Sequence, residues 1–146
     1  MLITESIIMF KPDAQDITVD VGHMCELHEV GAALLVSAGL EVVQHNTTQL
    51  SPDDVRQLYE KALAPNPADE AIWGTAWKDE VVTHISSAPV KSYLLKGVGD
   101  LAIPKTKRVK DFLRAHYGRT DNVVQNVAHV PDADEMTVAR RLLFGL

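Results

Sequence analysis

The chain has 146 residues, 46% of them hydrophobic and 23% charged, which is ordinary for one globular domain with its own core. Its formal net charge of −6 disfavours non-specific binding to nucleic acid or to anionic membranes. No apolar run approaches the roughly 18 residues of a membrane span. The single cysteine, Cys25, cannot form a disulfide within the chain, and the first residues lack a signal-peptide pattern. We therefore expect one cytoplasmic domain over residues 1–146, with neither nucleic acid nor membrane as a partner.

The first half of the chain alternates between strand and helix signals. The apolar run over residues 6–10 predicts a buried strand, which Pro12 ends. Apolar residues at helical spacing over residues 24–37 predict a helix, which Gly39 stops. Residues 40–49 are predicted as a second strand, because apolar residues there give way to polar alternation.

The second half opens on a strong helix start. Ser51 takes the N-cap position and Pro52 the first helical position, and two aspartates follow where the helix end is positive. Residues 66–85 are predicted to be helical again, divided near Gly74. The remaining predicted elements are a strand over residues 89–97, a basic helix over 104–118, a strand over 123–129 and a last helix over 133–144.

The order of these elements indicates one antiparallel sheet with helices packed on it. Strand and helix signals alternate four times, with an extra helix after the second strand. A split βαββαβ arrangement is a common solution for this order. We therefore predict an α+β fold of the ferredoxin-like type.

Two local patterns invite a metal or phosphate interpretation that their spacing does not favour. Of His23, Cys25 and His28, only the last two could share a helix face, and two ligands do not hold a structural zinc. Residues 96–100, KGVGD, lack the lysine and hydroxyl that follow in a phosphate loop. A partly exposed helix surface and a turn are the better interpretations.

A basic segment and one histidine are better candidates for a functional site. Six lysines and arginines fall within residues 105–119 of this acidic chain. A solvated helix face is the usual interpretation of such a run, but the forked donors of Arg108 and Arg114 could hold phosphates. His129 ends a predicted strand, just before a proline and an acidic cluster. It is either a half-buried, hydrogen-bonded histidine or a nucleophile.

With SIIMFKPDA near its start and NVAHVPDADE near its end, the chain resembles the nucleoside diphosphate kinase family. The first motif is similar to the family's first strand and its Lys-Pro-Asp, which begins here at Lys11. In the second motif, Asn126 precedes His129 by three residues and Asp132 follows it by three. The family's active histidine has the same two neighbours at the same offsets.

The middle of the chain carries further similar segments in the same order. LSPDDVRQLYEKA resembles the family's helix with an active-site tyrosine, here Tyr59. Trp77 lies ten residues before Ser87 of SSAPV, where the family has an aromatic residue that stacks on the nucleobase. KTKRV and LRAHYG resemble the segments that carry two phosphate-binding arginines, here Arg108 and Arg114.

The resemblance implies an enzyme that moves the γ-phosphate of ATP or another nucleoside triphosphate to a nucleoside diphosphate. A phosphohistidine on His129 would be the intermediate, with ping-pong kinetics. The negative charge of the phosphates would be neutralised by lysine, by arginine and by Mg²⁺ carried by the nucleotide. Family members usually assemble, so we expect a homo-oligomer. The implied roles are catalysis by His129 and Lys11, phosphate binding by Lys11, Arg108 and Arg114, orientation by Tyr59, ribose contact by Asn126, base stacking by Trp77 and support by Asp132.

Four departures from the family pattern keep a second interpretation open. Pro131 stands where the family has a serine near the transferring phosphate, and Arg140 stands where its last helix carries a glutamate. The segment between Arg108 and Arg114 is shorter than in the family and lacks a phosphate-contacting threonine, and residues 15–29 form a longer region. Losses in the supporting residues commonly reduce rate while sparing binding. The alternative is a catalytically weak or inactive nucleotide-binding regulatory module of the same fold.

Overall fold

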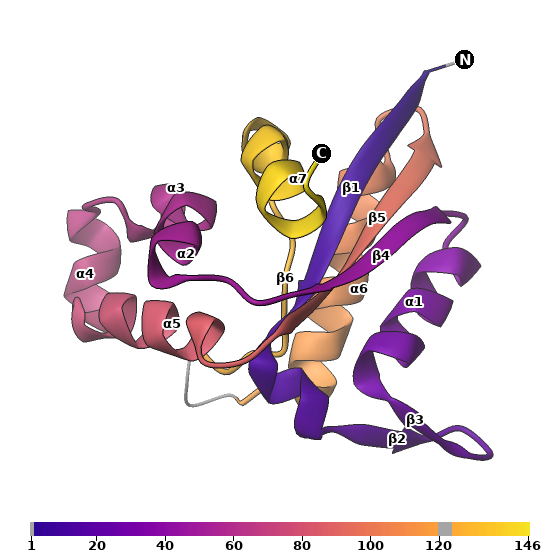
Figure 1. Ribbon diagram of the computed structural model, residues 1–146, viewed down its shortest axis with the longest axis horizontal. Helices are drawn as coiled ribbons and strands as arrows, with labels where there is room; N and C mark the ends of the chain where they lie inside the picture. Colours follow the sequence, from indigo (N-terminus) through magenta and orange to yellow (C-terminus); the bar gives the residue numbers. More distant parts are fainter. Residues whose placement is uncertain (1, 120–123) are drawn as a thin grey trace.

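A four-stranded antiparallel sheet forms the centre of the computed structural model, which describes residues 2–119 and 124–146 (Figure 1). The strand order is β4-β5-β1-β6, and every neighbouring pair is antiparallel. This order, with helices packed on the sheet, confirms the predicted α+β fold of the ferredoxin-like type. The strands are β1 (Ile3–Phe10), β4 (Glu41–Thr48), β5 (Val90–Val98) and β6 (Ala128–His129).

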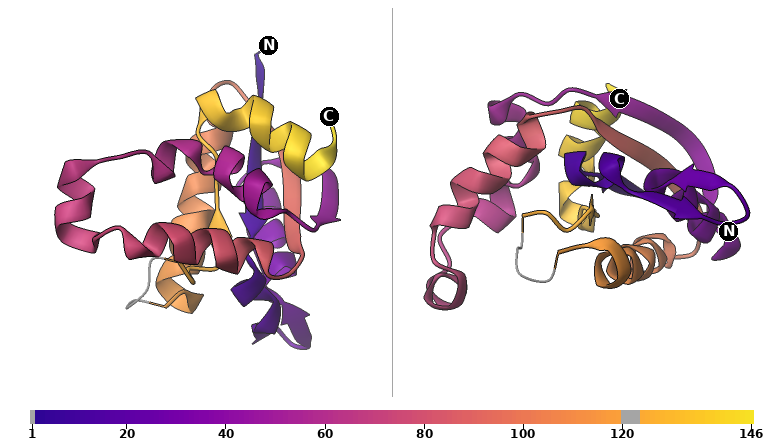
Figure 2. Two further views of the ribbon diagram at one scale, coloured as in Figure 1. Left: turned by 60° about the vertical axis from the view of Figure 1, so that its left-hand side comes forward. Right: turned by 90° about the horizontal axis from the view of Figure 1, so that it is seen from below.

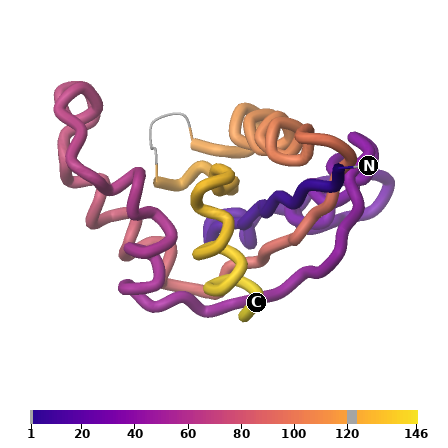
Figure 3. The backbone as a smooth tube through the Cα atoms, turned by 90° about the horizontal axis from the view of Figure 1, so that it is seen from above, coloured from indigo at the N-terminus to yellow at the C-terminus, as the bar shows by residue number. Residues whose placement is uncertain are grey.

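Helices cover both faces of the sheet, so that β1 lies between α6 and α7 when seen from above (Figure 3). Successive side chains of β1 point to opposite faces: Ile7 and Met9 join one core cluster, and Ile8 and Phe10 join the other. The uninterrupted apolar run of this strand is therefore buried on both faces of the sheet. The helical segments are η1 (Pro12–Asp16), α1 (Leu27–Ser37), α2 (Pro52–Leu58), α3 (Glu60–Leu63), α4 (Pro67–Trp73), α5 (Ala76–Ser86), α6 (Ala102–Tyr117), η2 (Ala133–Glu135) and α7 (Met136–Phe144).

The segment from α2 to α5 extends away from the sheet (Figures 1 and 2). Ser51 caps α2 as predicted, since its side chain accepts a hydrogen bond from the N–H of Asp54 at 3.1 Å. Gly74 divides α4 from α5, and its φ of 70° is a conformation that suits glycine. Among the described residues, no helix combines the length and apolarity that crossing a bilayer requires.

Two elements differ from the sequence expectation. The helix expected from residue 24 begins at Leu27, because Glu26 acts as its N-cap in a capping box with Glu29. The residues before it form a hairpin, in which β2 (Thr18–Asp20) pairs with β3 (Met24–Glu26). The strand expected over residues 123–129 is only two residues long where it is described, and residue 123 lies outside the described residues. The φ of 67° at Val127 interrupts an extended chain just before β6.

Candidate active site

The two motifs from opposite ends of the chain meet where β1 and β6 run side by side. Met9 is paired with His129 in the sheet, and Lys11 follows directly after β1. The N–H of Lys11 donates a hydrogen bond to the carbonyl of Val127 at 2.9 Å. The sheet thus brings the predicted nucleophile and the predicted lysine to one place, although more than a hundred residues separate them in the sequence.

The backbone just before His129 has an unusual conformation, and side chains from η1, α5 and α6 hold it in place. Val127 has a φ of 67°, which a β-branched residue rarely adopts. Its N–H donates to Oδ2 of Asp13 at 3.0 Å, and Oδ1 of the same carboxylate accepts from Nε2 of His84 at 2.8 Å. Nε of Arg114 donates to the carbonyl of Ala128 at 3.0 Å. Strain of this kind persists only where neighbouring contacts determine it, and here the Asp13 carboxylate does so.

The ammonium group of Lys11 is buried, and the residue is only 2% exposed. Nζ donates to the carbonyl of Val124 at 3.2 Å and to Oδ1 of Asn126. Burial lowers the pKa of Lys11 to about 7, with the charge of Arg114 as the next cause, while Asp13 opposes the shift. Lys11 therefore changes between its charged and neutral forms near neutral pH. Asn126 supports this lysine, and its contact with a ribose stays a prediction.

His129 is a half-buried residue with a neutral imidazole. Its Nε2 atom is buried and has no hydrogen-bond partner in the part of the chain that the structure describes. Burial lowers the pKa of His129 to about 3, and the positive charges of Lys11, Arg114 and Lys110 add to the effect. The ring is therefore uncharged at neutral pH, which is the form with a lone pair available for attack.

Tyr59 covers the imidazole. The two ring centroids are 4.4 Å apart and the rings are tilted by 32°. The Tyr59 hydroxyl is buried and lacks a hydrogen-bond partner within the described ranges, and burial raises its pKa. Leaving such a group unsatisfied costs about 1–3 kcal/mol, so a ligand oxygen at this point would be favourable. Lys11 Nζ lies 6.0 Å from the centre of the tyrosine ring.

Asp132 ties two helices together just after His129. Its Oδ2 atom lies 2.7 Å from Nζ of Lys61 on α3, and its Oδ1 atom accepts from Nζ of Lys107 on α6. These hydrogen bonds, that of Lys107 first, lower the pKa of Asp132 to about 2. The backbone N–H of Asp132 donates to Oε1 of Glu135 at 2.9 Å. Asp132 therefore supports the site by fixing the chain that follows the histidine.

The basic residues of α6 divide between two faces of the helix. Lys107, Lys110 and Arg114 follow one another at spacings of three and four, which places them on one face. All three are half-buried, and Lys110 and Arg114 affect the pKa of His129. Arg108 lies on the exposed face with Phe112, so the structure does not bring it to His129 as it brings Arg114. The Lys-Thr-x-Arg-Val motif indicated Arg108 and gave no signal for Lys110. Only the helical spacing of Lys110 from Lys107 and Arg114 could have indicated it.

Arg140, which departs from the family pattern in the last helix, forms an ion pair with a carboxylate of the sheet. Its Nε atom lies 3.8 Å from Oε1 of Glu5 on β1. A guanidinium group cannot accept a hydrogen bond, and Nε2 of His129 has no partner among the described residues. Neither Asp134 nor Glu135 takes over that partnership among the described contacts: Asp134 pairs with Lys61, and Glu135 caps η2.

A cleft of about 510 Å³ opens between α5 and the chain that leads into β6. His84 connects this cleft to the site, because it is both part of the lining and the partner of Asp13. Trp77, expected to stack on a base, is partly buried against the core cluster that contains Tyr59, and its Nε1 donates to the carbonyl of Gly74 at 3.1 Å. The cleft is lined by Asp79, Glu80, Thr83, His84, Ser87, Val124 and Gln125.

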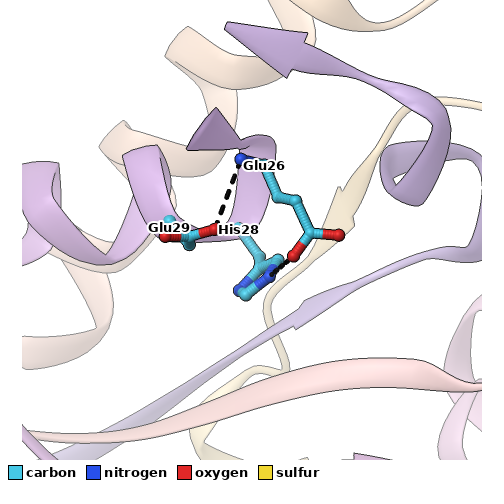
Figure 4. Close-up of side chains that lie close together, drawn as sticks. All are labelled: Glu26, His28 and Glu29. Carbon is cyan, nitrogen blue, oxygen red and sulfur yellow. Dashed lines mark hydrogen bonds and ion pairs between the residues drawn. The ribbon is translucent and has the colours of Figure 1, made fainter. Parts of the chain in front are cut away.

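The side chains that invited a metal interpretation belong to the β2–β3 hairpin and the start of α1, and Figure 4 shows one of them, His28, with Glu26 and Glu29. His23 and Cys25 contact each other at 3.2 Å in the β2–β3 hairpin. His28 bonds through Nε2 to Glu26 at 2.9 Å and through Nδ1 to the hydroxyl of Tyr93 at 2.7 Å (Figure 4 shows the first of these). Glu26 is also the helix cap, so these groups already have structural roles.

Comparison with known proteins identifies the fold but no sequence relative. No family model matches the chain, and no curated protein matches it. The nucleoside diphosphate kinase of Aquifex aeolicus matches with 17% identity and a TM-score of 0.64, over 98% of this chain and 96% of that one. An NDP kinase from Pyrobaculum aerophilum matches with 18% identity and a TM-score of 0.57, over 98% and 96%. The nucleoside diphosphate kinase of Halobacterium salinarum, in complex with CDP, matches with 16% identity and a TM-score of 0.58, over 92% and 86%.

These three structures cover nearly the whole chain, so this protein has the fold of the nucleoside diphosphate kinases. The resemblance that the short motifs indicated is confirmed at the level of the fold. At such low identity, the roles of individual residues depend on the geometry of this chain itself.

Proposed function

We propose that this protein is a nucleoside diphosphate kinase-type phosphotransferase that uses His129 as its nucleophile. The observation that carries the proposal is the neutral imidazole of His129, set beside the cations Lys11 and Arg114. An uncharged ring can attack phosphorus, and nearby positive charge favours the transfer because it stabilises the phosphoryl oxygens. The fold shared with three nucleoside diphosphate kinases supports the same conclusion.

The reaction would proceed in two displacements at phosphorus, in which one imidazole nitrogen is first the nucleophile and then the leaving group. In the first, a bond forms between the imidazole and the γ-phosphorus while the bond from phosphorus to the leaving diphosphate oxygen breaks. In the second, a terminal oxygen of another nucleoside diphosphate attacks the phosphohistidine, and the phosphorus–nitrogen bond breaks. Lys11, Arg114 and the Tyr59 hydroxyl would hold the phosphoryl oxygens in line with the ring. The Asp13 carboxylate would fix the backbone that aims the ring.

Substrates and setting follow from this chemistry. ATP and other nucleoside di- and triphosphates would bind with their phosphates at Lys11 and Arg114, and the predicted contacts of Trp77 with the base and of Asn126 with the ribose belong to this proposal. Mg²⁺ would come with the nucleotide and neutralise phosphate charge. The carboxylate of Asp132, which lies close to those of Asp134 and Glu135, already accepts hydrogen bonds from Lys61 and Lys107. A homo-oligomer and a cytoplasmic location remain part of the proposal, and sedimentation at micromolar concentration tests the first.

A second function, a nucleotide-binding regulatory module with little or no activity, is favoured by one specific observation. Nε2 of His129 has no described hydrogen-bond partner, and the last helix offers Arg140 paired with Glu5 in place of an acid. A ring that is less firmly oriented transfers phosphate slowly, since misplacement by about 1 Å can cost about 100-fold in rate. Binding of nucleotide would persist in such a module.

Labelling of the protein by ATP distinguishes the two functions. Purified protein is incubated with Mg²⁺ and ATP labelled on the γ-phosphate, and then with excess unlabelled GDP or CDP. We expect acid-labile, base-stable label that moves to the added nucleotide, and no label on His129→Gln. His116→Gln, which changes an exposed histidine on α6, serves as the control. Nucleotide binding without any label would support the regulatory module, and label on His129→Gln would refute the proposed nucleophile.

A further inference from the structure

One face of α6 lies along the segment that carries His129, and two contacts fix how the helix and the segment are aligned. Lys107 donates to the carboxylate of Asp132, which follows His129 by three residues. Arg114 donates to the carbonyl of Ala128, which directly precedes it. The helix and the segment therefore run in opposite directions between these two contacts.

Lys110 lies between the two contacts on the same helix face. It follows Lys107 by three residues and precedes Arg114 by four, and residues at those spacings are neighbours on a helix. On the opposing segment, His129 lies in the corresponding interval between Ala128 and Asp132. Lys110 is thus placed opposite the part of the segment that contains His129. Its influence on the pKa of both His129 and Lys11 agrees with that placement.

The side chain of Lys110 is only 15% exposed, although it carries a charge. Its described ion pair is with Asp111 at 3.3 Å, whose side chain is 70% exposed, so that pairing is weakened by water. Burial, followed by the charge of Arg114, lowers the pKa of Lys110. Holding a half-buried lysine here is unfavourable unless an anion offsets it.

The carboxylates around this group of cations are already engaged. Asp13 accepts from Val127 and His84, and Asp132 accepts from Lys61 and Lys107. Besides burial, which is the largest cause for both lysines, the charges of Arg114 and Lys110 lower the pKa of Lys11, and those of Arg114 and Lys107 lower the pKa of Lys110. Positive charge is therefore in excess beside His129, in a place suited to a ligand with several negative charges.

We infer that Lys110 is a phosphate-binding residue of this site and contacts the phosphate chain of a nucleoside di- or triphosphate together with Lys11 and Arg114. This inference rests on the proposed function and names a residue of its binding site. Lys110 would bind phosphate in place of Arg108, which the sequence motif indicated but which lies on the exposed face of the helix. Because its target is the phosphate chain, Lys110 acts equally on ligands with and without a base.

Equilibrium binding of ADP and of inorganic pyrophosphate tests this inference without any need for turnover. Replacement of a charge-assisted hydrogen bond by a neutral group weakens binding by about 10- to 100-fold. We expect Lys110→Gln to weaken both ligands by such a factor, and Lys110→Arg, which keeps the charge, to restore most of the affinity. Lys96→Gln, the same change at an exposed lysine of β5, is the matched control and should leave both affinities within about twofold.

Arg108→Gln decides between the two candidate residues. If Arg108→Gln weakens pyrophosphate more than Lys110→Gln does, or if Lys110→Gln behaves like Lys96→Gln, the inference is wrong. Urea unfolding of each variant confirms that it is folded. Should Lys110→Gln not fold, Lys110→Met, which also removes the charge, takes its place: weakened binding of both ligands would support the inference, and unchanged binding would overturn it. Weakened ADP binding by Lys110→Gln in a protein that forms no phosphohistidine would sink the proposed kinase activity and still support Lys110. A wild-type protein that binds neither ligand would overturn both.

Discussion

Replacement of His129 by glutamine should change how the stability of the protein depends on pH. In the folded protein the pKa of His129 is lowered from 6.5 to about 3, chiefly by burial. Between these values the unfolded chain takes up a proton that the folded protein does not, so the free energy of unfolding falls as the pH falls. From pH 6.5 to pH 5 this amounts to about 1.5 pH units at about 1.36 kcal/mol each, or about 2 kcal/mol. His129→Gln cannot titrate and escapes this loss.

Urea unfolding at pH 7.5 and at pH 5 measures the difference. The destabilisation caused by His129→Gln should be smaller at pH 5 than at pH 7.5 by about 2 kcal/mol. Val130→Ala is the control, because Val130 is a buried neighbour without a titrating group, and its cost should be the same at both pH values. An equal cost for His129→Gln at the two pH values would show that the folded imidazole takes up a proton as readily as the unfolded one. The proposal that His129 is a neutral nucleophile because the fold removes water from it would then be wrong.

Two further predictions concern the residues that surround the imidazole. Since burial lowers the pKa of Lys11 to about 7, the free protein loses this charge above neutral pH. ADP affinity should therefore fall by up to about tenfold per unit as the pH rises past 7, and a flat profile from pH 6 to pH 9 would contradict the role of Lys11 in binding. Asp13→Ala leaves the N–H of Val127 without its acceptor and should cost about 1–3 kcal/mol in urea unfolding, together with slower phosphoenzyme formation. Asp13→Asn, which keeps an acceptor oxygen, should recover most of the stability; if both variants lose the same amount, the hydrogen bond to Val127 is not what matters.

Much of the candidate site could be predicted from short motifs, because the residues proposed to do chemistry stand next to residues that shape the chain. Lys11 follows a buried strand and His129 ends another, so an antiparallel sheet could be expected to bring them together. Arg114, which a motif also indicated, donates a hydrogen bond to the residue before His129, and its role in binding phosphate stays a prediction. Arg108 was favoured by the same kind of motif, but a continuous α6 turns it toward solvent. A motif gives the order of residues and not the direction in which a helix presents them.

The contacts made by Asp13 show a different limit. Its sequence position after Lys11 and Pro12 suggested only the end of a strand. In the folded protein its two oxygens join η1, α5 and the chain before β6. Such a contact depends on where three segments lie in space, and the sequence holds no periodic signal for it. The same is true of the β2–β3 hairpin, whose second strand was interpreted as the start of a helix.

The sequence by itself determined the alternation of strands and helices, the N-cap at Ser51 and the flat apolar strand β1, because these depend on neighbouring residues and on their spacing. Only the tertiary structure decided the charge state of His129 and Lys11. Both side chains are ordinary in the sequence, and both change their pKa because the packed protein removes water from them and places cations nearby. Burial is a property of the whole fold, and the chemistry of this site depends on it.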